Sequence, residues 1–198
     1  MAIRRFSTSS LTTGSKSSKF WDQETLPGAF ESIAVATSSG SDATITFSNI
    51  PQNYTHLQIR FSGRQSGAGS MPGATIKPNS ATGSPYAWHN VYGSGSGSPA
   101  TQNGTTAGSL PIFQGIAAVS ATANVFSSAI LDILDYASTT KNKTFRCLSG
   151  ADLNGGGEIH FTSGLWMSTA AITQLDITSN ATSFVQYTQA ALYGIRGA

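Results

Sequence analysis

Three kinds of side chain in this sequence could support chemistry: histidines, a single cysteine and a pair of aspartates. His56, His89 and His160 are far apart and form no His-x-His or His-x-x-x-His pair, so their spacing gives no sign of a metal site. Asp132 and Asp135 in "LDILDY" lie three residues apart, and on a strand such residues point to opposite faces. A carboxylate pair facing one cleft, as glycoside cleavage requires, is therefore not expected. Asp135 is predicted to begin the turn before "ASTT".

Nucleophilic chemistry has equally little support in the sequence. Cys147 is the only cysteine, which excludes an internal disulfide and fits assembly in a reducing cytosol. It lies within "TFRCLS", and we expect a buried strand residue there rather than a reactive thiol. The chain has no Gly-x-Ser-x-Gly elbow, and "GSGSGSP" lacks the lysine of a phosphate-binding loop. We therefore expect no enzymatic activity, no cofactor and no metal.

Four aromatic residues offer a different kind of site. Tyr86, Trp88, Tyr92 and Trp166 could line a glycan-binding face, because flat rings stack on the C–H surfaces of sugars. In an all-β domain, aromatic residues at alternating strand positions more often belong to the core or to a subunit interface. The sequence therefore favours a core or interface position over a glycan-binding face.

The elements that must position these residues are strands, because alternation of apolar and polar residues recurs along the chain. In "YTHLQIRF", Thr55, Leu57, Ile59 and Phe61 point one way. Turn signals such as "SSGSD", "IPQN" and "LNGGG" separate the segments. This pattern predicts an all-β, jelly-roll-like antiparallel β-sandwich. Further strands are expected at 30–37, 43–48, 86–92, 125–136, 144–149, 158–163, 171–177 and 183–195.

The composition is unusual for a globular protein. Charged residues make up 10% of the chain, against roughly 25% in an average domain. Ser, Thr, Asn and Gly must therefore form much of the solvated surface.

The uncharged segment 110–131 is long enough to suggest a membrane span, but Pro111, Gln114, Gly115 and Asn124 argue against one, and we expect no membrane partner. The region from Gly63 to Ala107, interrupted only by "ATIK" and "YAWHNVY", is expected to form long surface loops.

The N-terminal segment differs sharply from the rest of the chain. The first twenty residues carry four bases and no acid, whereas the remainder has seven bases and nine acids. Serine-rich basic segments are typical of organelle addresses, but residues such as Gly14 disfavour the amphipathic helix that those need. There is also no continuous apolar run of a secretory signal. We interpret residues 1–29 as an extended basic arm and residues 30–198 as one β-sandwich domain.

The arm is predicted to anchor the protein to other subunits. The body lacks the basic, aromatic-rich face of a nucleic-acid-binding domain, so no nucleic-acid partner is expected. Docking on an acidic protein surface explains the charges of the arm, and a solvated tail is the simplest alternative. Strand addition or side-chain contacts would hold it. The predicted anchoring residues are Arg4, Arg5, Phe6, Lys16, Lys19, Phe20 and Trp21.

Two segments carry apolar residues at both odd and even positions. In "SFVQYTQAALYGI" these residues include Phe184, Tyr187, Leu192 and Tyr193, and "VFSSAILDILDY" behaves similarly. A strand with one face in water alternates cleanly, so this pattern predicts that both faces are covered. A neighbouring subunit would supply one cover, with these four residues at the interface. A loop folded back over the sheet is the alternative.

Seven segments carry a family resemblance, and in chain order they are "RRFSTSSLTTGSKSSKFWD", "FESIAVAT", "FSNIPQNYTHLQIR", "YAWHNVYGSGS", "LDILDYASTTKNKT", "SGLWMSTAAIT" and "ALYGIRG". Together they resemble small virion structural proteins of tailed phages that infect cyanobacteria and marine bacteria. The resemblance implies a jelly roll presented as a homotrimer, and a role as a capsid decoration (cement) protein or a tail-fibre module. We therefore expect a virion protein, assembled in the host cytoplasm, whose arm binds the major capsid protein or other virion subunits and stabilises the shell. The alternative is a tail-fibre or adhesin module that binds host-surface glycan.

Overall fold

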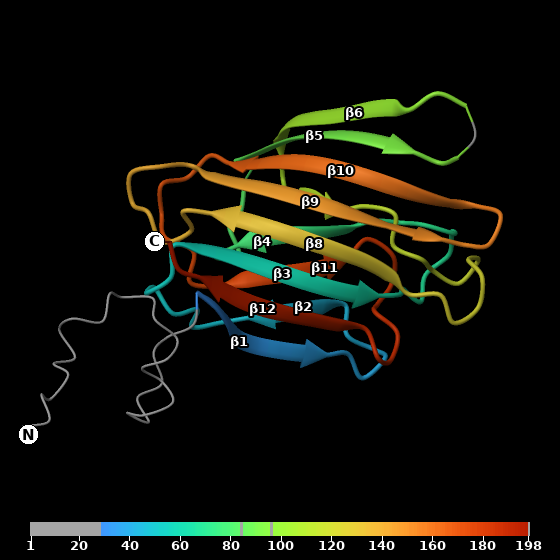
Figure 1. Ribbon diagram of the computed structural model, residues 1–198, viewed down its shortest axis with the longest axis horizontal. Coiled ribbons are helices and arrows are strands. Elements are labelled where there is room, and N and C mark those ends of the chain that lie inside the picture. Colours follow the sequence, from blue (N-terminus) through green and yellow to red (C-terminus); the bar gives the residue numbers. More distant parts are fainter. Residues whose placement is uncertain (1–28, 84, 96, 198) are drawn as a thin grey trace, which may run out of the picture.

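A computed structural model describes residues 29–83, 85–95 and 97–197, which form two antiparallel β-sheets (Figure 1). The large sheet has eight strands in the order β1-β12-β3-β8-β9-β10-β5-β6, and the small sheet has four in the order β2-β11-β4-β7. The described residues contain no helix. The strands are β1 (Phe30–Thr37), β2 (Thr44–Phe47), β3 (His56–Gly63), β4 (Ala74–Pro78), β5 (Tyr86–Gly93), β6 (Ala100–Ala107), β7 (Leu110–Phe113), β8 (Ser127–Leu134), β9 (Lys143–Asp152), β10 (Gly157–Trp166), β11 (Leu175–Ser179) and β12 (Gln189–Ile195).

The connectivity is that of a jelly roll with two inserted hairpins. Without β5–β6 and β9–β10, the remaining eight strands alternate between the sheets, giving β1-β12-β3-β8 in one and β2-β11-β4-β7 in the other. Two four-stranded sheets connected in this way are the jelly-roll arrangement. Both inserted hairpins join the same edge of the same sheet, so they double the width of one layer and leave the other unchanged. Figure 1 shows β5 and β6 at the side of the large sheet farthest from β1.

The hydrophobic core lies between the two sheets and follows from strand alternation. On β3, Leu57, Ile59 and Phe61 are buried, while the side chains between them face outward. The small sheet contributes Ile76 of β4 and Ile177 of β11, which are register partners and fully buried. Phe61 also packs against the rings of Phe113 and Phe184, with centroids 5.3 and 5.8 Å away. The predicted β-sandwich class and the inward face of β3 are therefore confirmed, with Thr55 lying just before the strand.

The expected strands are present, and three more occur. β4 contains the "ATIK" interruption of the predicted loop region, β6 lies where a loop was expected, and β7 begins the segment 110–131, for which no strand was predicted. The sequence of β6 shows no apolar alternation because it is an edge strand whose ladder bonds go to β5 alone. The expected strand 183–195 is shorter, because Tyr187 has a φ of 71° in a turn that precedes β12.

Buried polar side chains fasten the loops to this framework. Gln65 is fully buried: its amide donates to the carbonyl of Gly73 at 2.8 Å, and its oxygen accepts from the Ser179 hydroxyl at 2.8 Å. Lys143 is also fully buried, and its Nζ donates to the carbonyls of Lys141, Ser138 and Thr169 at 2.7, 2.8 and 3.2 Å. Burial lowers the pKa of this ammonium group. These contacts tie loops on opposite sides of β9 and β10 together without requiring ion pairs.

Two buried tyrosines differ in their hydrogen bonding and should respond differently to removal of the hydroxyl. Tyr136 donates to the carbonyl of Pro51, whereas the buried hydroxyl of Tyr86 has no partner among the described residues. Burial raises the pKa of Tyr86 to about 12. Tyr86→Phe should leave the free energy of unfolding unchanged or higher, while Tyr136→Phe should lower it by about 1 kcal/mol because an acceptor loses its donor. Urea unfolding of both variants measures the difference, and equal losses would contradict this assignment.

Candidate functional site

The outer face of the large sheet carries a continuous apolar stripe. Val91, Phe161, Leu148 and Ile130 are successive cross-strand partners on β5, β10, β9 and β8. Their side chains are 44, 46, 50 and 43% exposed. Alternation explains their position, because the residues beside them in sequence, such as Cys147, point into the core. Scattered exposed apolar residues are ordinary, but neighbours aligned across four strands form a patch that favours a partner.

The same face carries a polar row immediately beside the stripe. Gln58, Asp132, Arg146, Ser163 and His89 follow one another across β3, β8, β9, β10 and β5. The Gln58 amide donates to Asp132 at 2.8 Å. The outer face is therefore striped, with an apolar centre and a polar border, which is the usual composition of a protein–protein contact surface.

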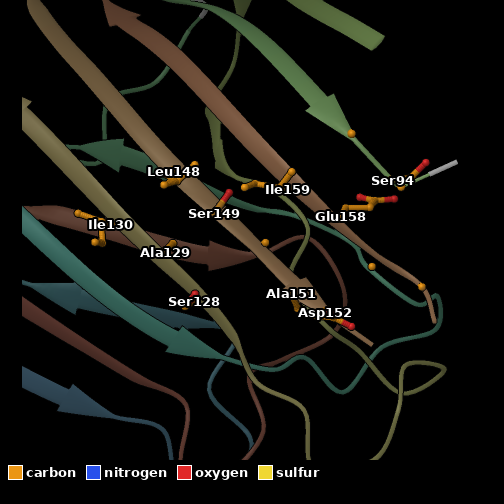
Figure 2. Close-up of a pocket in the computed structure, with 15 residues that line it drawn as sticks. Ser94, Ser128, Ala129, Ile130, Leu148, Ser149, Ala151, Asp152, Glu158 and Ile159 are labelled. Carbon is orange, nitrogen blue, oxygen red and sulfur yellow. The ribbon is translucent and has the colours of Figure 1, made fainter. Parts of the chain in front are cut away.

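An open hollow of about 550 Å³ lies alongside the stripe, on the side away from the polar row (Figure 2). Ile130, Leu148 and Ile159 supply apolar side chains. Among the residues that the structure describes, the lining includes two acidic residues, Asp152 and Glu158, and no lysine, arginine or histidine. The remaining lining residues are small: Gly93, Ser94, Gly95, Ser128, Ala129, Ser149, Gly150, Ala151, Gly156 and Gly157.

Two glycines keep the β9–β10 ladder closed beneath the hollow. Gly150 has a φ of 147°, and a Cβ at this position would collide with the carbonyl oxygen of Glu158. Gly157 has a φ of 130°, and a Cβ there would meet the carbonyl oxygen of Ala151. Both positions therefore require glycine, for the close approach of the neighbouring backbone as well as for the conformation.

A buried histidine holds one of the two carboxylates. His160 lies with its ring stacked on Tyr92 at a centroid distance of 5.0 Å, and its Nε2 is 2.8 Å from Glu158 Oε2. Its Nδ1 is 3.0 Å from the Asn90 amide nitrogen, and Asn90 accepts a hydrogen bond from Thr162 at 3.2 Å. This cluster holds the Glu158 carboxylate on the inner side of the large sheet. Sequence reasoning missed it, because only the pairing of β10 with β5 brings these residues together.

The three histidines stay apart in the fold. His56 Nδ1 accepts a hydrogen bond from the Asp135 amide at 3.0 Å, His89 belongs to the polar row, and His160 lies in the buried cluster. Within residues 29–83, 85–95 and 97–197, no group of three or more His, Cys, Asp or Glu side chains that could hold a metal ion is found.

The other residues whose side chains could take part in a reaction have structural roles. Cys147 is fully buried, as predicted, and burial raises the pKa of its thiol to about 12. Asp132 lies on β8, while Asp135 lies in the following turn with a φ of 49°, as its sequence context predicted. The Asp135 carboxylate accepts a 2.7 Å hydrogen bond from Lys141, which lowers its pKa.

The four aromatic residues suggested for glycan binding do not form a surface. Tyr86 and Trp166 are register partners buried in the core, so their assignment to a sugar-stacking face is wrong. Trp88 is half-buried and packs against the core, and Tyr92 stacks on His160. These residues share the inward face of their strands, where alternation placed them.

The four suggested interface residues also differ from one another in burial. Phe184 and Leu192 are fully buried within the single chain and cannot contact a second subunit, so that prediction is wrong for both. Tyr193 is half-buried and stacks on Phe30 at 4.7 Å. Tyr187 is 71% exposed. The apolar residues of "VFSSAILDILDY" do point both ways, with Leu131 and Ile133 inward and Ile130 and Leu134 outward.

The predicted anchoring residues of the arm lie outside the described part of the chain. These are Arg4, Arg5, Phe6, Lys16, Lys19, Phe20 and Trp21. Among the described residues, none belongs to a helix long and apolar enough to cross a membrane.

Comparison with known proteins gives no relative from which a function could be transferred. No protein-family model matches the chain, no curated protein matches it, and no solved structure matches its fold. The fold and the surface together define an all-β jelly-roll protein with one widened sheet and a striped outer face, and its function must be inferred from these features.

Exposed and buried residues of β9 should differ sharply in their contribution to stability. Leu148→Ser should change the free energy of unfolding by no more than about 1 kcal/mol, because Leu148 already lies half in water. Phe145→Ala on the same strand should cost about 3–5 kcal/mol, since Phe145 is fully buried. Denaturant unfolding distinguishes the two, and a loss above 2 kcal/mol for Leu148→Ser would show that the stripe belongs to the core.

Proposed function

We propose that this protein is a non-enzymatic structural component of a phage virion, a capsid decoration protein that its N-terminal arm attaches to the shell. The main support is the apolar stripe on the large sheet, because a single chain leaves it open to water and a regular assembly would cover it. The resemblance of the sequence to small virion proteins gives the kind of assembly. The major capsid protein and neighbouring virion subunits are the proposed partners.

The edges of the large sheet add to this support. β1 carries one charged residue, Glu31, and β6 carries none. Soluble proteins usually protect edge strands with lysines, prolines or bulges, because unpaired backbone groups invite another chain. β1 and β6 have no lysine, although the register shifts once in each ladder. Such edges are expected in a protein whose edge strands are covered by other subunits when it functions.

The alternative is a tail-fibre or adhesin module that binds host-surface glycan. The burial of Tyr86 and Trp166 removes the stacking face that the sequence suggested for it. The hollow, with two carboxylates and several serines, is the remaining feature that could accept a sugar. The decoration role accounts for the stripe and the arm together, and we prefer it for that reason.

Removal of the arm should abolish attachment while leaving the domain folded. All twelve strands lie within residues 30–195, and the Arg196 amide donates to the carbonyl of Ala29 at 3.0 Å, so deletion of residues 1–28 preserves every described contact. Purified truncated protein should show a cooperative unfolding transition but should not rebind virions from which the protein has been depleted. The full chain serves as the positive control, and rebinding of the truncated protein with unchanged affinity would refute the anchoring role.

The stripe should mediate assembly of a homotrimer. Light scattering of the full chain at micromolar concentration should give three times the mass of one chain. Leu148→Ser should lower that mass, because a polar side chain at the centre of an apolar contact loses burial energy without unfolding the monomer. Thr46→Ser, on the exposed side of the small sheet, is the matched control and should leave the mass unchanged. A monomer at all concentrations, or equal behaviour of the two variants, would contradict the trimer.

A further inference from the structure

We infer that the hollow on the large sheet receives the Lys19–Phe20–Trp21 segment from the arm of a second copy of this chain. The inference rests on the proposed role of the arm as an attachment segment, and it identifies one partner surface for that segment. Because the hollow lies alongside the apolar stripe and shares Ile130 and Leu148 with it, the arm and the stripe would form one continuous contact between copies.

The composition of the hollow complements this segment. Among the described residues, its lining contains two acidic residues, Asp152 and Glu158, and no lysine or arginine. Ile130, Leu148 and Ile159, which are 43 to 61% exposed, supply an apolar floor. The arm sequence "KFW" places one base directly beside two large aromatic residues. Aromatic anchors seated in an apolar depression, with a charged pair at the rim, are the usual arrangement of an interface hot spot.

One carboxylate, that of Asp152, stands where the hollow meets its rim. Asp152 ends β9 and is exposed, and one of its oxygens accepts a 2.7 Å hydrogen bond from the Asn154 amide. Glu158 alternates with the exposed Ile159, and its Oε2 turns inward to the buried His160. The Asp152 carboxylate is thus held in place before a ligand arrives, and an ammonium group at the rim would meet an oriented oxygen. Preorganised groups cost less conformational entropy on binding.

The size of the hollow also suits a short segment with two aromatic side chains. A cavity volume of about 550 Å³ lies within the range of roughly 300–1,000 Å³ that binds compact ligands. The small residues around it, including Gly93, Gly95 and Gly156, leave room for aromatic rings above the apolar floor. Two aromatic side chains would cover the exposed part of the stripe that borders the hollow.

Geometry favours a second copy over the arm of the same chain. Phe30 begins β1, whereas Ser128, at the hollow, is in the register row of Thr37 at the other end of β1. Strand spacing and rise place Phe30 about 26 Å from Ser128, at the near edge of the hollow, and about 30 Å from Gly150 near its centre. The nine residue steps from Trp21 to Phe30 extend to about 30 Å at most, so Trp21 could reach the centre of its own hollow only with the chain fully extended.

A contact between an arm and a hollow joins two different surfaces. Such heterologous contacts close into rings when the rotation between copies allows it. A ring of three copies, each giving its arm to the next, agrees with the proposed trimer. The remaining basic residues, Arg4 and Arg5, would then be free to contact the shell.

Disulfide trapping between two different samples tests this inference on the full chain. One sample carries Ser18→Cys in the arm and the other carries Ser128→Cys at the hollow, with a small mass tag on the second. A heterodimer on a non-reducing gel can then arise only between copies. The native Cys147 is buried and its pKa is raised to about 12, so it should not take part. Ser48→Cys, exposed after β2, replaces Ser128→Cys as the matched control.

The expected result is rapid formation of the 18–128 heterodimer and little of the 18–48 product. Trp21→Ala in the arm sample should slow trapping at least about tenfold, because it removes an aromatic anchor. Asp152→Lys in the hollow sample should slow it about two- to fivefold, and Lys19→Glu in the arm sample should restore the rate. Thermal unfolding of each variant confirms that the domain is intact.

Equal trapping at Ser128 and Ser48, or failure of the Lys19→Glu and Asp152→Lys pair to restore the rate, would overturn the inference. Rebinding of the full chain to depleted virions distinguishes a failure of this inference from a failure of the proposed function. If trapping fails while the full chain still rebinds, the arm has another partner and only the inference is wrong. If trapping succeeds while rebinding fails, the copies bind one another but the decoration role is wrong.

Discussion

The structure is governed by the difference in width between its two sheets. An antiparallel sheet must bury at least one face, and the inward residues of the large sheet do so against the small sheet and the connecting loops. The small sheet has four strands and the large sheet has eight, because the β5–β6 and β9–β10 hairpins were both added to one layer. The added strands need apolar residues inward for the core, yet they also carry Val91, Leu148 and Phe161 outward. This second set serves no purpose in the isolated chain.

The residues on the inner side of the added strands explain why these strands are ordered although few strands of the small sheet cover them. β7 is the strand of the small sheet that contacts β9, β10 and β5. Beyond it, polar residues replace aliphatic ones, as in the Asn90–Thr162–His160 cluster, whose members satisfy one another's hydrogen-bonding groups. A satisfied polar cluster tolerates a thin cover better than a large apolar side chain would, and it also holds the Glu158 carboxylate on the inner side of the sheet.

Much of the fold could be predicted from the sequence because burial imposes a period of two on each strand. Leu57, Ile59 and Phe61 show that period, and the structure places all three in the core. The prediction failed where another constraint outweighed the pattern. β6 is specified by its pairing with β5 rather than by burial, and the positive φ at Tyr187 ends a run of β-favouring residues.

The candidate site was less predictable than the fold. Apolar residues on both parities correctly indicated an outward apolar face on β8, but they did not separate core residues such as Phe184 from surface residues. The stripe depends on the registers of four strands that are distant in sequence, and the hollow depends on where three of those strands end. Neither quantity can be read from the period of a single segment.

The most direct measurement is an image reconstruction of a virion that carries this protein, at a resolution that separates β-strands. The account predicts that the outer face of β8, β9, β10 and β5 packs against a neighbouring subunit, with additional density in the hollow between Asp152 and Ile130. A large sheet whose outer face is open to solvent in the assembled particle would contradict it.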